Sequence, residues 1–201
     1  MRRAMGLIAF VCALTVPAMA QNTPIVEVFG GYSYARVDLT DIKHVNANGW
    51  SASATENLNS WFGGTLEVSG YYAAPRLTIF GITTKPGSNV YTVLFGPRFS
   101  YRKFQKLTPF VHALLGVAHI HASENGFSTS DNSFAAALGG GVDVRLGDKF
   151  AVRVVQGDYV YTRFMSLGIS PQTGGIVFSG PRVRQNNFRV SAGVVLCFGK
   201  K

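Results

Sequence analysis

The chain has 201 residues, of which 47% are hydrophobic and only 14% are charged, and its formal net charge is +9. The charged share is low against a usual value of about 25%, whereas 23 glycines and 12% aromatic residues are prominent. Few charges, many glycines and aromatic residues, and the lack of a long apolar run favour membrane β structure over membrane helices. No basic run or nucleic-acid motif accompanies the positive charge, so we expect no nucleic-acid partner.

The first 20 residues have the pattern of a secretory signal peptide. Arg2 and Arg3 give a positive start, residues 6–16 form a short apolar run, and residues 18–20 read Ala-Met-Ala before Gln21. A basic start, an apolar stretch of this length and a small-x-small site are the three parts of such a peptide. We therefore expect cleavage after residue 20 and a single domain over residues 21–201.

Cleavage changes both the charge and the cysteine content. Loss of Arg2 and Arg3 leaves 17 basic residues against 10 acidic ones, a net charge near +7. For an exported protein we expect this charge to meet anionic lipid head groups and lipopolysaccharide. Cys12 leaves with the peptide, and Cys197 lies in an apolar segment, where it is expected to act as a small hydrophobic side chain.

Eight segments of the mature chain alternate between apolar and polar residues, which predicts eight β-strands with two different faces. In the fourth segment, Tyr91, Val93 and Phe95 share one face, whereas Thr92 and Arg98 share the other. Segments of about 10 alternating residues between turns are typical of transmembrane β-barrels. The predicted strands cover residues 26–37, 49–57, 61–72, 90–102, 109–121, 133–146, 150–164 and 187–198.

The phase of the seventh segment is ambiguous. Arg153 and Asp158 have opposite parity, so they cannot face the same side of a regular strand. Either a β-bulge separates the two residues, or one of them lies near a rim of the barrel.

The connections alternate between short and long. Short ones cover residues 58–60, 103–108 and 147–149, and long ones cover residues 38–48, 73–89, 122–132 and 165–186. This is the layout of an all-β, eight-stranded antiparallel up-and-down transmembrane barrel in an outer membrane, with short turns and both termini in the periplasm. A soluble barrel is the alternative, but its water-facing side would carry more charges than the Gly, Ser and Ala present here.

Four pieces of the chain carry a resemblance to a known family: residues 28–34 (VFGGYSY), 49–53 (GWSAS), 95–99 (FGPRF) and 184–193 (RQNNFRVSAG). In this order the chain resembles the OmpA-like eight-stranded barrels, in particular the outer membrane protein beta-barrel domain proteins of acidobacterial-type genomes. The resemblance implies a cell-envelope protein of a Gram-negative bacterium that the barrel assembly machinery inserts. Such barrels often end on an aromatic residue, whereas here Gly-Lys-Lys follows Phe198.

Charged residues on the inward face of the predicted strands are the candidate site. The interior of an eight-stranded barrel is just wide enough for side chains to fill, and isolated charges there would be costly. We expect these groups to form a structural salt-bridge network, with a narrow gated pore as the alternative. The candidates are Glu27, Glu67, Arg98, Asp143, Arg145, Arg153 and Arg189.

Two weaker patterns carry other chemistry. His119 and His121, with His44, are weak candidate metal ligands at the outer rim. His121 and Ser123, followed by Glu124, are similar to the His-x-Ser of outer-membrane lipid A deacylases, but neighbours in sequence need not form a triad. We therefore expect no metal, no cofactor and no catalytic set. The leading hypothesis is a monomeric, non-enzymatic barrel with a structural or surface-interaction role through its long loops, and a deacylase-like enzyme is the alternative.

Overall fold

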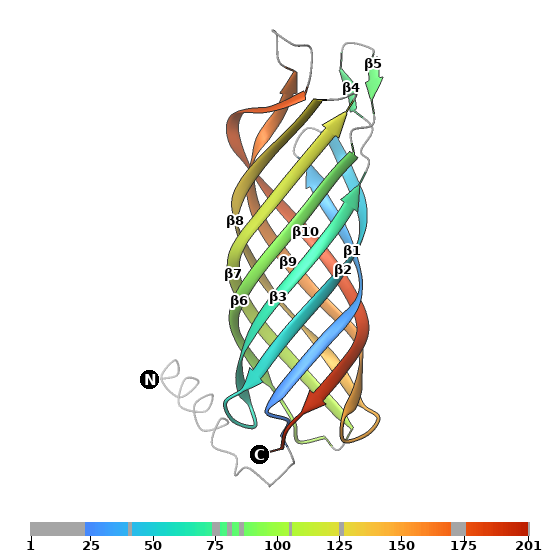
Figure 1. Cartoon of the computed structure of the whole chain (residues 1–201), viewed down its shortest axis with the longest axis vertical. Helices are drawn as coiled ribbons and strands as arrows, with labels where there is room; N and C mark the ends of the chain where they lie inside the picture. Colours follow the sequence, from blue (N-terminus) through green and yellow to red (C-terminus); the bar gives the residue numbers. More distant parts are fainter. Residues whose placement is uncertain are drawn as a thin grey trace, which may run out of the picture.

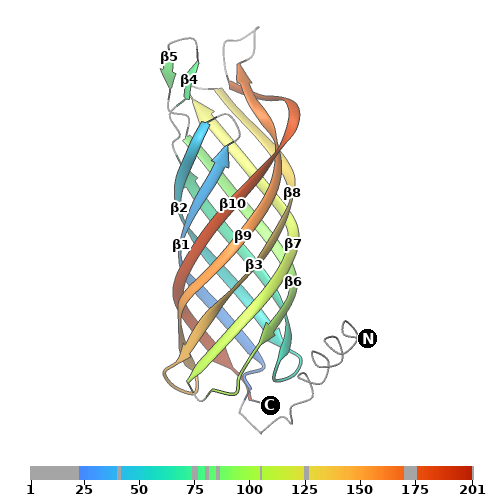
Figure 2. The same ribbon diagram turned by 180° about the vertical axis from the view of Figure 1, so that it is seen from behind.

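The computed structural model describes residues 23–39, 42–73, 77–79, 82–84, 87–104, 106–124, 127–169 and 176–200. Eight long antiparallel strands form a closed barrel in the order β1-β10-β9-β8-β7-β6-β3-β2 (Figures 1 and 2). A separate two-stranded sheet joins β4 (Leu77–Ile79) and β5 (Ile82–Thr84). The barrel strands are β1 (Val26–Leu39), β2 (Ile42–Asn57), β3 (Phe62–Ala73), β6 (Gly87–Ser100), β7 (Leu107–Glu124), β8 (Phe127–Arg145), β9 (Phe150–Ile169) and β10 (Ile176–Phe198).

The barrel closes where the first strand meets the last. β1 pairs with β10 in an unbroken antiparallel register, in which Glu27 lies opposite Cys197 and Ser33 lies opposite Ser191. Closure removes the free strand edges, so every barrel strand has two hydrogen-bonded neighbours. The predicted fold class, an eight-stranded antiparallel barrel, is thus confirmed.

The two faces of the barrel have the polarity of a membrane protein. Outward side chains such as Phe95 (63% exposed) and Leu138 (66% exposed) are large and apolar. Inward side chains on the same strands are buried, and many of them are polar or charged, as Arg98 and Asp143 are. A soluble barrel would have the opposite polarity.

Three short turns lie at the end of the barrel where β1 begins and β10 ends (Figure 1). We call this end the turn end. The opposite end, which carries β4 and β5, is called the loop end. One short turn is held by the Asn59 side chain, whose Oδ1 accepts hydrogen bonds from the backbone N–H groups of Trp61 and Phe62. In another, a hydrogen bond from the Lys200 ammonium, 2.7 Å away, lowers the pKa of the exposed Asp148 carboxyl.

The strands extend further toward the loop end than the sequence predicts. Residues 122–132 and 165–186 were expected to be loops, but the β7–β8 pairing continues to Glu124 opposite Phe127, and the β9–β10 pairing reaches Ile169 opposite Ile176. Residues 128–132 of the first extension read Ser-Thr-Ser-Asp-Asn, and the second extension is interrupted by Gly180 and Pro181. Water contacts both faces of a strand beyond the membrane, so the apolar alternation that marks a strand is lost there, while the backbone pairing continues.

A β-bulge in β9 explains the ambiguous phase of this strand. Val142 lies opposite Val155 and the next residue, Asp143, lies opposite Arg153, so Val154 is the extra residue. Val154 and Val155 are both exposed on the outer face, and Arg153 is buried in the interior. The bulge therefore brings Arg153 and Asp158 to the same, inner side of the barrel, which settles the two alternatives left open by the sequence.

Candidate functional site

The lower part of the lumen, nearest the turn end, contains three arginines around two carboxylates. Asp143 accepts hydrogen bonds from Arg153 Nε at 2.7 Å and from Arg98 Nη2 at 2.8 Å. Glu27 accepts one from Arg102 Nη2 at 2.7 Å, and its other oxygen lies 3.3 Å from Arg98 Nη2. All five side chains are buried, so each charge depends on its partners rather than on water.

The upper part of the network contains two carboxylates that share one arginine. The Arg189 guanidinium donates to Glu67 and, through Nε at 2.7 Å, to Asp158. Asp158 also lies 2.7 Å from Nε2 of His112. Gln156 connects the two parts, because it accepts from Arg153 at 2.7 Å and donates to Asp158 at 2.8 Å. The result is one continuous plug across the lumen, whose charged and polar members come from seven of the eight barrel strands and which also hydrogen-bonds to side chains of β2.

Charge and aromatic packing are balanced within this plug. Four arginines face four carboxylates, so its formal charge is zero when His112 is neutral. The Arg98 guanidinium lies 3.9 Å from the ring centroid of Phe110, and that of Arg153 lies 4.2 Å from the ring centroid of Phe29. Aromatic faces attract guanidinium groups most strongly where water is excluded. The arrangement therefore places matched charges in the lower lumen.

Gly139 allows the hydrogen bond between His112 and Asp158. In the sheet, Gly139 on β8 lies between His112 on β7 and Asp158 on β9. A Cβ atom at Gly139 would lie 1.9 Å from Asp158 Oδ1 and 2.4 Å from the backbone oxygen of Gly157. The two side chains meet above this glycine because it has no side chain of its own.

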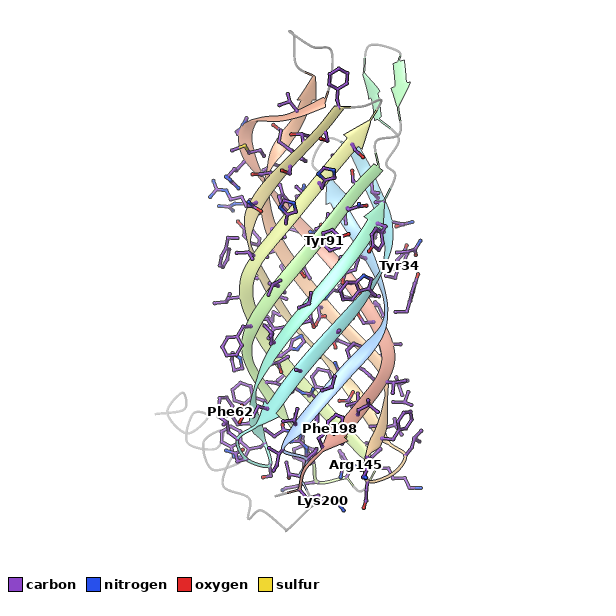
Figure 3. The ribbon with its side chains drawn as sticks, in the orientation of Figure 1. Tyr34, Phe62, Tyr91, Arg145, Phe198 and Lys200 are labelled. Carbon is purple, nitrogen blue, oxygen red and sulfur yellow. The ribbon has the colours of Figure 1, made fainter. Side chains whose placement is uncertain are left out.

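Six of the seven lumen candidates from the sequence, all except Arg145, lie in this plug. Arg145 is the last residue of β8 and lies half-buried at the turn end (Figure 3). The sequence reasoning left four members out: Arg102, His112, Gln156 and Asp158. The alternation placed Arg102 and His112 on the inward face, and the bulge hid the parity of Gln156 and Asp158.

The residues with candidate metal or nucleophile chemistry lie on the outside of β7. His119 is exposed and its Nδ1 lies 2.7 Å from Oδ1 of Asn132, while His121 and Ser123 follow at alternate positions on the same face. The side chains of His44 and Glu124 lie outside the described part of the chain. Within the described residues, no group of three or more His, Cys, Asp or Glu side chains could hold a metal ion.

Two aromatic girdles surround the barrel on its outer face. Tyr34 and Tyr91 lie toward the loop end, and Phe62 and Phe198 lie at the turn end (Figure 3). Between the girdles the outward side chains are mainly aliphatic, such as Leu115, which is 59% exposed. Aromatic rings of this kind mark the two interfaces of a membrane.

An apolar outer band, two girdles and a polar lumen define a transmembrane β-barrel. Among the described residues, no helix is long and apolar enough to cross a membrane. The family profile described as "Outer membrane protein beta-barrel domain" matches residues 6–195, so the chain belongs to this family, as the resemblance predicted. Its location is therefore the outer membrane. No curated protein matches the sequence.

Solved structures of outer-membrane barrels share the fold at low sequence identity. Neisserial surface protein A matches with a TM-score of 0.63 and 12% identity over 86% of this chain and 97% of that protein. OprG of Pseudomonas aeruginosa gives a TM-score of 0.57 with 12% identity over 90% and 98% of the two chains. Ail, the attachment invasion locus protein of Yersinia pestis, gives 0.52 with 19% identity over 86% and 99%. These similarities support the fold of the chain.

Proposed function

We propose that the protein is a non-enzymatic outer-membrane barrel that does not conduct and that has a structural or surface-interaction role through its loop end. The buried plug carries this proposal, because its matched charges occupy the lumen between the turn end and Arg189. A barrel filled in this way offers no continuous water path. The extended hairpins at the loop end then remain as the part available to a partner.

The alternation of short turns and long hairpins supports an orientation with the turn end and both termini in the periplasm. Two cysteine variants in the Cys197→Ala background test it: Ser128→Cys, exposed at the loop end, and Gly147→Cys, in a turn with open space around it. A membrane-impermeant maleimide should label intact cells only through Ser128→Cys. Labelling of Gly147→Cys alone would reverse the orientation.

Two measurements test the closed, non-enzymatic role. Purified protein in planar bilayers should give no conductance steps, and regular steps would instead support the narrow pore. Cells that carry Ser123→Ala should keep the lipid A and phospholipid profile of the parent, and a changed profile would support the deacylase-like alternative.

Deleting the gene should sensitise cells to detergent or reduce their attachment to surfaces. A barrel lacking residues 77–84 should fail to restore attachment if the loop end acts in contact.

A pair of exposed arginines near the loop end supports lipopolysaccharide as a lipid partner. Arg163 on β9 and Arg184 on β10 are exposed and lie directly opposite each other in the register. Like charges in this position destabilise a sheet. The adjacent pair in the register is Tyr161 and Asn186, and the aromatic ring of Tyr161 supports a position of both guanidinium groups near the head groups. A phosphate bound between them would neutralise the repulsion and accept paired hydrogen bonds.

Lipid retention during purification tests this partner. The parent protein should copurify with lipopolysaccharide, and the double variant Arg163→Ala/Arg184→Ala should lose most of this lipid. The control Lys103→Ala/Lys149→Ala removes the same charge from exposed turn-end positions and should retain it. Equal loss in both variants would mean that net charge alone attracts the lipid, and equal retention would exclude this arginine pair as the site.

A further inference from the structure

A cavity of about 100 Å³ lies in the lumen on the loop-end side of the plug. Its lining is mainly aliphatic and aromatic and comes from β1, β2, β3, β6, β7, β9 and β10. Ala35, Ala47, Val90, Val160 and Phe164 form much of this lining. The two halves of the lumen therefore differ in kind: charged side chains fill one, and mainly apolar side chains line unfilled volume in the other.

Small side chains on one wall create the volume. Ala35 on β1 lies opposite Ala47 on β2 in the register, and both point inward. Nearer the turn end, the inward position on β1 holds Phe29, which packs beneath Arg153. Because side chains just fill an eight-stranded barrel, two facing alanines leave a space that the inward side chains Val160 and Phe164 of β9 line but do not fill.

The floor of the cavity selects against charge. Arg189 forms part of the lining, but its guanidinium already faces the carboxylates of Glu67 and Asp158. An anionic ligand would meet a cation that is already paired, so this contact would not offset the cost of removing the ligand's hydration. On the polar side of the lining, Asn187 donates to Thr162 Oγ1 and Thr162 donates to Gln185 Oε1, both at 3.3 Å, so these side chains are hydrogen-bonded to one another.

We propose that this cavity binds a small, uncharged hydrocarbon group of roughly the size of benzene. An apolar protein cavity of about 150 Å³ stays dry and takes up benzene, and the volume here is of the same order. The cavity lies at the height of the upper girdle, because Ala35 follows Tyr34 and Val90 precedes Tyr91. This inference is independent of any contact made by the loops.

Methyl NMR of the full barrel in phospholipid nanodiscs, titrated with benzene, tests the proposal. The inward methyl groups of Val90, Ile120 and Val160 should show saturable shift changes and cross-peaks to benzene. Those of Val111 and Val117, which face the lipid, should change only in proportion to the benzene dissolved in the membrane. Cross-peaks from Val90 to lipid tails, displaced by benzene, would assign the same hydrocarbon site to an acyl chain.

A filling variant and a matched control separate the cavity from the surrounding lipid. Ala47→Leu places extra carbon atoms in the cavity and should abolish the saturable shifts. Ala113→Leu adds the same atoms on the lipid-facing side of β7 and should bind like the parent. Should Ala47→Leu fail to fold, Ala35→Val makes a smaller filling of the same wall. Unsaturable shifts, parent-like binding by Ala47→Leu, or water cross-peaks at Val90 and Val160 without benzene binding would each overturn the proposal.

Discussion

At the scale of single residues, Asp143 is the most connected acceptor of the lower plug. It accepts from both Arg98 and Arg153, so Asp143→Asn would leave two buried guanidinium groups without their shared counter-charge. Removing one partner of a buried ion pair costs about 3–5 kcal/mol, and we expect that loss in the free energy of unfolding. Urea unfolding in lipid vesicles, followed by tryptophan fluorescence, measures it. Glu56→Gln, at an exposed position, should change stability by less than about 0.5 kcal/mol.

Gly139 gives a second residue-scale prediction that concerns shape rather than charge. Gly139→Ala should break the His112–Asp158 contact and destabilise the barrel by about 1–3 kcal/mol, since the added Cβ overpacks a filled site. Gly30→Ala is the matched control, because nothing lies within 4 Å of a Cβ at this outward position. Equal unfolding midpoints for the two variants would contradict this role of Gly139.

At the scale of elements, the bulge in β9 predicts that this strand tolerates the deletion of one residue. Deleting Val154 would bring Arg153 and Val155 into regular alternation, so Gln156 and Asp158 would still face inward. Deleting Val117 from the regular strand β7 would instead move the following residues to the opposite face. We expect the Val154 deletion to fold, seen as heat-modifiable migration in electrophoresis, and the Val117 deletion to fail. Failure of both would mean that the bulge is required for closure.

The alternation of apolar and polar residues explains which parts of the fold the sequence could predict. Alternation located all eight strands wherever lipid contacts one face and the lumen the other, as for Phe95 and Arg98 on β6. It missed the strand extensions, where that contrast ends. It placed Glu67 and Arg189 inside, but not as a pair, because 122 residues separate them and only closure brings them together. The cavity was not predictable either, since it depends on Ala35 meeting Ala47 across the register.

At the scale of the whole molecule, Cys197 reports on closure. It is buried on β10 opposite Glu27 on β1, at the seam between the first and last strands. A maleimide should react with it at least about tenfold more slowly in the folded barrel than in urea, because reaction requires access to the thiolate. Rapid labelling of the folded protein would show that the seam opens.

Among the described residues, the four buried arginines are matched by four buried carboxylates, so the remaining charged side chains of this part of the chain lie at exposed or half-buried positions. Ionic strength therefore acts on two parts of the molecule differently. Raising salt from about 0.1 M to 1 M shortens the Debye length from about 10 Å to 3 Å, which weakens contacts with anionic head groups but does not reach pairs enclosed by protein. Salt should release the barrel's charged partners while its unfolding midpoint stays nearly constant.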